Sequence, residues 1–197
     1  MNTTQNDGWL DRRETVAEML RDRGTLLLVC GLGGTTWDAA AVSQSPLDFH
    51  LWGAMGNAAM IGLGLALAQP ERPVLVVTGD GEMLMGMGAL ATIAVQAPGN
   101  LSILLLDNEL YGETGRQPTH TALGVDLPAV ARATGIADAE TITDMAGVTA
   151  FRERMHGSIG PRFASAKVSQ AEQTMVLPER DGTLIKNRFR SALLGEI

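Results

Sequence analysis

Gly79-Asp80-Gly81-Glu82 is the stretch of sequence that decides the fold. It ends an apolar, β-branched run, Pro73 to Thr78, that is typical of a buried parallel strand. A second polar stretch, Asp107-Asn108-Glu109-Leu110, ends another apolar run, Leu101 to Leu106. Because the carboxyl ends of parallel strands meet at one edge of a sheet, we expect the two polar stretches to lie side by side.

The first polar stretch also opens a predicted helix, Met83 to Gln96, which is rich in Ala, Met and Leu. The first N–H groups of a helix lack partners and favour an anion, which would bind here beside Gly81 and Glu82. Taken alone, Gly-Asp-Gly is more typical of a simple turn after a strand. Its pairing with the second polar stretch favours an anion site over that simple turn.

The same edge of the sheet carries a predicted metal site. Mg²⁺ prefers oxygen ligands and often takes some of them from bound phosphate groups. The chain offers three such oxygens, from the carboxylate of Asp80, the side-chain amide of Asn108 and the main-chain carbonyl of Leu110.

The spacing of these residues resembles a known signature. Gly79-Asp80-Gly81 is followed by twenty-six residues and then by Asn108, and the thiamin diphosphate signature runs Gly-Asp-Gly, about 24–27 residues, Asn. The family usually has Asn where this chain has Asp107, at the place that does not bind the metal. The resemblance implies that the chain binds thiamin diphosphate through Mg²⁺.

Leu51-Trp-Gly-Ala-Met-Gly56 resembles a second element of the thiamin-dependent 2-oxoacid decarboxylases, the segment beneath the aminopyrimidine ring. The resemblance implies that the carbonyl of Gly53 accepts a hydrogen bond from the exocyclic amine of the cofactor. It also implies that the Met55 side chain wedges between the two rings, a gap that an unbranched, polarizable side chain suits.

A third element, Gly31 to Asp38, resembles the first strand-to-helix turn of that family, where Gly34 and Thr35 approach the diphosphate. The alternative is a dinucleotide-binding turn, Gly-x-Gly-x-x-Gly, but it needs glycine at the position of Thr36. The resemblance therefore places these residues at the cofactor: Gly34, Thr35, Gly53, Met55, Gly79, Asp80, Gly81, Glu82, Asn108, Leu110 and Tyr111.

The predicted fold is a single α/β domain, a doubly wound parallel sheet of the thiamin diphosphate-binding type. We expect the domain to span residues 1–197, with its core at about 25–168 and a C-terminal arm and helix at about 169–197. The apolar stretch Ala54 to Ala68 is too short to span a bilayer and predicts a buried helix. Its internal glycines, Gly56, Gly62 and Gly64, predict a closely packed neighbour.

The composition excludes several classes of function. With 197 residues, 45% of them hydrophobic, the chain can form one sizeable core. Its net charge of −7 argues against non-specific nucleic-acid binding. The single cysteine, Cys30, cannot form an internal disulfide, and no charged-then-apolar leader opens the sequence. We therefore expect a cytoplasmic protein that binds neither nucleic acid nor a membrane.

Most thiamin-dependent decarboxylases are about three times longer, because they carry pyrimidine-binding and middle domains on the same chain. This chain resembles the beta subunit of two-chain 2-oxoacid decarboxylases that act on sulfopyruvate or phosphonopyruvate. The resemblance implies a separate alpha, pyrimidine-binding subunit, in an α2β2 heterotetramer, which supplies the glutamate that activates the cofactor.

The loop after the metal site is the expected place of the substrate, a small 2-oxo acid. The candidate catalytic residues there are Glu113, Arg116 and His120. The planar guanidinium of Arg116 suits a sulfonate, phosphonate or carboxylate, but Arg116 and His120 are equally compatible with contacts to the partner chain. A carboligase of acetolactate synthase type and a non-catalytic, cofactor-binding regulatory subunit are the alternative functions.

Overall fold

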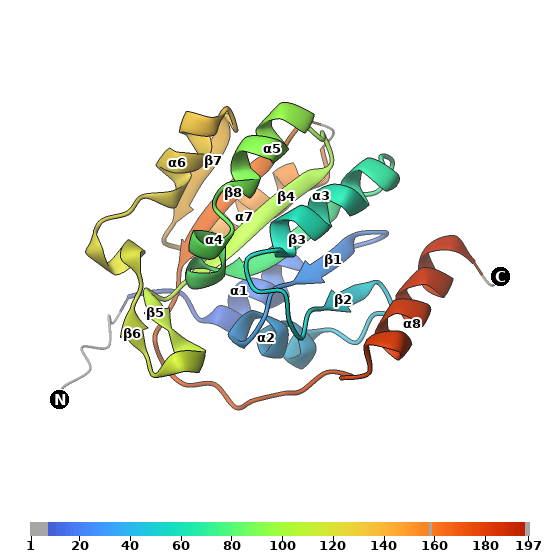
Figure 1. Ribbon diagram of the computed structural model, residues 1–197, viewed down its shortest axis with the longest axis horizontal. Coiled ribbons are helices and arrows are strands. Elements are labelled where there is room, and N and C mark those ends of the chain that lie inside the picture. The colour runs from blue at the N-terminus through green and yellow to red at the C-terminus, as the bar shows by residue number, and fades with distance from the viewer. Residues whose placement is uncertain (1–7, 158, 196–197) are drawn as a thin grey trace.

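Six parallel strands form the centre of the molecule (Figure 1). The computed structural model describes residues 8–157 and 159–195. The strand order across the sheet is β2-β1-β3-β4-β8-β7, and a small antiparallel hairpin, β5-β6, lies beside it. The strands are β1 (Leu27–Cys30), β2 (Asp48–His50), β3 (Val74–Gly79), β4 (Leu101–Asp107), β5 (Leu110–Tyr111), β6 (Gln117–Pro118), β7 (Asp138–Ile142) and β8 (Arg162–Lys167).

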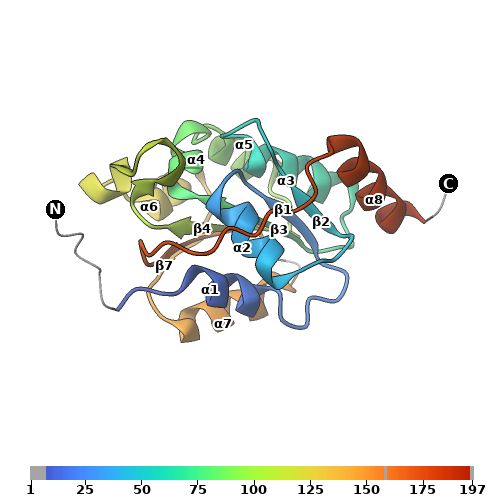
Figure 2. The ribbon, with the colours of Figure 1, turned by 90° about the horizontal axis from the view of Figure 1, so that it is seen from below.

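Helices cover both faces of the sheet (Figure 2). One face carries α1 (Arg12–Met19), α2 (Gly34–Val42) and α7 (Met145–Met155). The other carries α3 (Ala58–Ala68), α4 (Asp80–Met85), α5 (Ala89–Gln96) and α6 (Leu127–Thr134), while α8 (Gly182–Leu194) packs against the edge strand β2. In the described residues no helix combines the length and apolar character that a bilayer crossing requires.

The strands are apolar on both faces because each face is covered. In β3, Val74 and Val76 pack into the core beneath α3 and α5, whereas Leu75 and Val77 pack into the core beneath α1 and α7. All four side chains are fully buried. This double burial explains why the strand reads as a continuous apolar run. The predicted doubly wound parallel fold is confirmed.

The direction of winding reverses between β1 and β3. From β1 the chain runs through α2 to the edge strand β2, and then returns through α3 to β3 on the other side of β1. In open α/β sheets, ligands bind at such a reversal, outside the carboxyl ends of the strands. The loops after β1 and β3 meet at this position.

The predicted helix from Met83 to Gln96 is wrong in its bounds. The structure has two helices there, and the first of them already begins at Asp80. The break at Gly86 has a steric cause, because a Cβ on Gly86 would stand 1.9 Å from the carbonyl oxygen of Gly56. The backbones of Gly56 and Gly86 are in contact at this point, and a side chain at position 86 would separate them.

The glycines of α3 have unlike surroundings. A Cβ on Gly62 would stand 2.2 Å from Cγ2 of Val76 in β3, so this glycine permits close packing of the helix on the sheet. Gly64 is exposed and has open space around its Cα. The prediction of a closely packed neighbour therefore holds at Gly62 and is wrong at Gly64.

We predict opposite effects of alanine at these two glycines. Gly62→Ala should lower the free energy of unfolding by about 1–3 kcal/mol, since the added methyl overlaps Val76. Gly64→Ala, the matched control on the same helix, should raise it by about 0.5–1 kcal/mol, because alanine favours a helix. Chemical denaturation measures both changes, and a Gly62→Ala protein as stable as wild type would contradict the packing described.

Candidate active site

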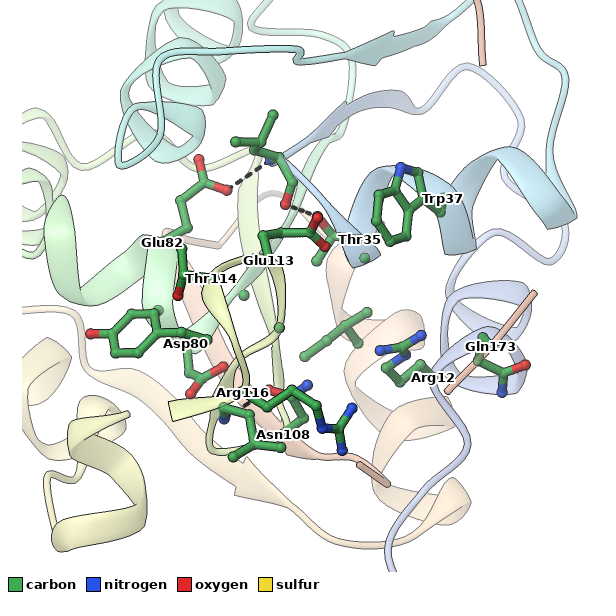
Figure 3. A pocket seen from close by; sticks show the side chains of 18 of the residues that line it. Arg12, Thr35, Trp37, Asp80, Glu82, Asn108, Glu113, Thr114, Arg116 and Gln173 are labelled. Atoms are coloured by element: carbon green, nitrogen blue, oxygen red, sulfur yellow. Dashed lines mark hydrogen bonds between the residues drawn. The ribbon is translucent and has the colours of Figure 1, made fainter. Parts of the chain in front are cut away.

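A pocket of about 440 Å³ lies at the carboxyl edge of the sheet, where the winding reverses (Figure 3). The loops after β1, β3 and β4 form its walls, and part of the C-terminal arm, residues 169–181, forms its rim. Ten of the residues expected at the cofactor line it, together with two of the predicted catalytic residues. These are Gly34, Thr35, Met55, Gly79, Asp80, Gly81, Glu82, Asn108, Leu110, Tyr111, Glu113 and Arg116.

Asp80 is the first residue of α4 and is almost completely buried, at 2% exposed. The hydroxyls of Thr119 and Thr121 both donate to its Oδ2 atom. The single hydroxyl proton of Thr121 is shared with Asp107, whose Oδ1 atom lies 2.8 Å from the same hydroxyl oxygen. These bonds fix the orientation of the Asp80 carboxylate at the wall of the pocket.

Asp107 stands where the thiamin diphosphate signature usually has Asn, and the structure shows how its charge is held. Lys167, from the neighbouring strand β8, donates to Asp107 at 2.8 Å and to Glu109 at 2.9 Å. Ser165 donates to the same carboxylate at 3.2 Å. Burial disfavours the charge on Lys167, but its bonds to the two carboxylates outweigh burial and raise the pKa of the ammonium.

The environment of Asp80 makes its charge costly in the absence of a cation. Burial and then repulsion from Asp107 raise the pKa of Asp80 from 3.8 to about 6, although the hydroxyls of Thr119 and Thr121 oppose the shift. A bound divalent cation would relieve both effects, because it supplies positive charge where solvent is excluded.

The loop after β4 turns back toward Asp80. Glu109 adopts a left-handed backbone conformation, with φ of 61°, and Leu110 donates its N–H to Oδ1 of Asn108 at 3.0 Å. The hairpin bonds use the carbonyls of Glu109 and Tyr111. Since successive peptide groups of a strand point to opposite sides, the carbonyl of Leu110 faces away from β6.

The donor set at this edge fits Mg²⁺. It comprises a carboxylate, an amide oxygen and a main-chain carbonyl, which are hard ligands, and it leaves other positions for phosphate and water. The described ranges contain no group of three or more His, Cys, Asp and Glu residues able to hold a metal. Such a group is typical of transition-metal sites and differs from the oxygen set expected here.

Glu82, in the first turn of α4, joins two loops of the site to that helix. Its Oε2 atom accepts the N–H of Leu32 at 3.0 Å, and its Oε1 atom accepts the N–H of Gly56 at 3.3 Å. A Cβ on Gly31 would stand 2.0 Å from Oε2, so a larger residue there would displace the Glu82 carboxylate. Both carboxylate oxygens are therefore engaged with the protein backbone rather than free in the pocket.

The structure does not bring two of the predicted residues into the pocket. Gly53 is exposed, and a Cβ atom added to it would have no neighbouring atom within 4 Å. His120 is exposed, and its Nδ1 atom lies 3.5 Å from the hydroxyl of Tyr111. The ring of Tyr111 in turn packs over Gly81, where a Cβ would stand 2.7 Å from the ring.

Glu113 and Arg116 do line the pocket. Burial raises the pKa of Glu113, and the positive charge of Arg12 partly opposes this shift. The guanidinium of Arg116 donates to the carbonyl of Gln170 at 2.9 Å and lies 3.8 Å from Glu172. Arg116 therefore contacts the C-terminal arm in this structure.

Several residues of the site could not be inferred from the sequence. Thr119 and Thr121 lacked any motif, and only the fold shows that they contact Asp80. Arg12, at the first turn of α1, is far from the signature in sequence. The arm residues have no periodic pattern that could place them at the rim, namely Ala171, Glu172, Gln173 and Met175.

Comparisons with known proteins agree with this geometry. The family model of the thiamine pyrophosphate enzyme, C-terminal TPP binding domain, matches residues 32–176. The chain is 37% identical to sulfopyruvate decarboxylase subunit beta of Methanothermobacter thermautotrophicus over 182 residues, which cover 92% of this chain and 93% of that protein. It is 49% identical over 108 residues to phosphonopyruvate decarboxylase of Streptomyces hygroscopicus, covering 55% of this chain and 26% of that one.

Solved structures show the same fold. Benzoylformate decarboxylase from Polynucleobacter necessarius matches with a TM-score of 0.70 at 17% identity, over 88% of this chain and 36% of that chain. The fold and the site thus define a thiamin diphosphate-binding α/β domain. The chain belongs to the family of thiamine pyrophosphate enzymes, through their C-terminal TPP binding domain, and is similar over nearly its whole length to a decarboxylase beta subunit.

We predict that the Asp80 charge destabilises the metal-free protein. Its pKa is raised on folding, so between about pH 4 and pH 6 the folded state binds the proton more tightly than the unfolded chain, and stability from this group falls as the pH rises. Asp80→Asn should therefore raise the free energy of unfolding at about pH 7.5 in chelator, and the gain should shrink toward pH 4.

Chemical denaturation of both proteins across this pH range measures the difference. Glu71→Gln is the matched control, because Glu71 is an exposed carboxylate near the opposite end of β3. A difference between wild type and Asp80→Asn that does not vary with pH would contradict the raised pKa.

Proposed function

We propose that this chain is the diphosphate- and Mg²⁺-binding subunit of a thiamin diphosphate-dependent decarboxylase that acts on a small 2-oxo acid of the sulfopyruvate or phosphonopyruvate kind. The observation that carries the proposal is the set of hard oxygen ligands beside the first turn of α4. The similarity to a decarboxylase beta subunit over nearly the whole chain supports it. On this view residues 1–197 form one cofactor-binding domain of a cytoplasmic enzyme.

The proposed metal ligands are one oxygen each from Asp80, Asn108 and Leu110, and the cofactor diphosphate completes the set. The N–H groups of Gly81 and Glu82, in the first turn of α4, face the diphosphate on one side. On the other side, Gly34 and Thr35 begin α2. Further contacts to the cofactor remain predictions from the resemblance, at Gly53, Met55, Gly79 and Tyr111.

When bound, the cofactor supplies the electron sink for the pair of electrons that departing carbon dioxide leaves behind. The chain itself positions this group and controls protons around it. Glu113 lies at the pocket, and burial raises its pKa, a direction that favours a carboxylic acid able to give a proton. His120 stays a weaker candidate, since it reaches the site only through its contact with Tyr111.

A separate alpha subunit would complete the active site, and we propose an α2β2 assembly. An apolar surface adjoins the pocket on the face of α3, α4 and α5. The exposed apolar side chains of these helices and of the turn between α4 and α5 are Met60, Leu67, Met85, Met87 and Val95. Met55, Met60 and Met85 line a shallow hollow, and Met55 also lines the main pocket. Such a surface supports contact with a second subunit.

The metal assignment predicts that Asp80→Ala abolishes Mg²⁺-dependent binding of thiamin diphosphate, because it removes the only proposed charged ligand. Isothermal titration calorimetry on the assembled protein measures this loss. Glu71→Ala, which removes an exposed carboxylate at the other end of β3, should bind like wild type. Wild-type affinity in Asp80→Ala would show that the metal binds elsewhere.

The subunit assignment predicts that the purified chain alone decarboxylates neither sulfopyruvate nor phosphonopyruvate at a measurable rate. Addition of the alpha subunit should restore carbon dioxide release, because that chain supplies the group that activates the cofactor. Mass spectrometry verifies that the isolated preparation contains no other chain. Activity in such a preparation would refute the need for a partner.

A further inference from the structure

Two arginines reach the pocket, and they are held differently (Figure 3). The guanidinium of Arg116 contacts the C-terminal arm, where it donates to the carbonyl of Gln170 and lies near the carboxylate of Glu172. Arg12 comes from the first turn of α1, on the side of the pocket formed by α1 and α2. In Figure 3 it lies well apart from Asp80 and Asn108.

A fully buried carboxylate anchors Arg12. Its Nε atom lies 2.9 Å from Oδ2 of Asp38, and the Asp38 side chain has no exposed surface. The geometry makes this contact an ion pair rather than a hydrogen bond. Arg13 donates from its own Nε to the other oxygen of Asp38, at 3.2 Å. Asp38 is therefore shared by two arginines, and the negative charge of Asp11 also lies close enough to raise the pKa of Asp38.

The outer nitrogens of Arg12 remain available. Within the part of the chain that the structure describes, Nη1 and Nη2 of Arg12 meet no hydrogen-bond acceptor, whereas Nη2 of Arg13 donates to the carbonyl of Thr174. Nη1 of Arg12 lies 3.5 Å from the position of a Cβ on Gly34, so the guanidinium extends over a residue that has no side chain. The side chain is 15% exposed, and the residue lines the pocket.

The carboxylates that line the pocket do not bind the outer nitrogens of Arg12. Asp80 faces the proposed metal, and the Glu82 carboxylate accepts two main-chain N–H groups. Glu113 lies near enough for Arg12 to oppose the rise in its pKa, but no hydrogen bond or ion pair joins the two in the described residues. The planar pair of Nη atoms is thus a preorganised, partly desolvated receptor for two oxygens of one anion.

We propose that Arg12, anchored by Asp38, binds a tetrahedral oxyanion in this pocket, of the phosphate, phosphonate or sulfonate class. Two groups of the proposed reaction have this chemistry, the terminal phosphate of the cofactor and the second acid group of the substrate. The assignment rests on the proposed function for the identity of the anion. It adds a receptor on α1, outside the signature and outside the residues expected from sequence.

The test uses Arg12→Gln, Arg12→Lys and, as the matched control, Arg13→Gln in the assembled protein. Arg13 shares the anchor Asp38 but does not line the pocket. One arm measures the binding of thiamin diphosphate with Mg²⁺ by calorimetry. The other arm measures kcat/KM for sulfopyruvate and for pyruvate at saturating cofactor, and binding of sulfopyruvate by calorimetry. Thermal unfolding verifies that each variant is folded.

Loss of a charge-assisted hydrogen bond predicts a weakening of about 10- to 100-fold in Arg12→Gln and a smaller one in Arg12→Lys, which keeps the ion pair with Asp38 but lacks the planar fork. Weaker cofactor binding identifies the phosphate as the anion. Unchanged cofactor binding with a selective loss on sulfopyruvate identifies the substrate. If Arg12→Gln does not fold, Arg12→Lys is compared with Arg13→Gln instead. The inference then requires that Arg12→Lys loses more affinity for the cofactor, or more kcat/KM for sulfopyruvate, than Arg13→Gln does.

Two results would overturn the inference. One is that the Arg12 variants have the same cofactor affinity and the same kcat/KM for sulfopyruvate as Arg13→Gln. The other is an equal loss on pyruvate and sulfopyruvate with unchanged cofactor binding, since a structural effect would not distinguish the substrates. If wild type turns over neither substrate, the proposed function fails, and the two calorimetric measurements still decide whether Arg12 binds an oxyanion.

Discussion

The buried carboxylate of Glu82 is the constraint on which the geometry of the site depends. It accepts one N–H from the loop after β1, at Leu32, and one from the loop before α3, at Gly56. A buried carboxylate without partners is costly, but here two N–H groups and the first turn of α4 offset that cost. Because Asp80 lies two residues earlier on the same helix, the position of the proposed metal ligand is fixed relative to both loops.

Two neighbouring carboxylates have different roles beside the proposed cation site. Asp107 is paired with Lys167, so its charge is compensated within the protein. Asp80 has two hydroxyls and a main-chain N–H as partners, and burial beside Asp107 raises its pKa. The bridging hydroxyl of Thr121 links the two and keeps them from separating. Of the two, Asp80 is thus the carboxylate at the pocket that lacks a basic partner in the described residues, which favours cation binding there.

The sequence predicted the central features because they are local. Apolar runs mark the strands, and the signature residues follow them directly, so the parallel sheet and the meeting of Asp80 with Asn108 could be inferred. Long-range contacts could not be inferred: the pairing of Thr119 and Thr121 with Asp80 depends on a hairpin of short strands, and the break after α4 depends on contact between two distant glycine backbones. The short strands β2 and β7 were missed because they contain charged residues and lack a long apolar run.

The central claim is that a divalent cation joins this chain to the diphosphate of its cofactor. Anomalous diffraction from the assembled protein, crystallised with Mn²⁺ and thiamin diphosphate, tests it most directly, because Mn²⁺ replaces Mg²⁺ at oxygen sites. The account predicts one strong peak at about 2.1 Å from oxygens of Asp80, Asn108 and Leu110. A peak bound by other residues, or cofactor without a metal at this edge of the sheet, would contradict it.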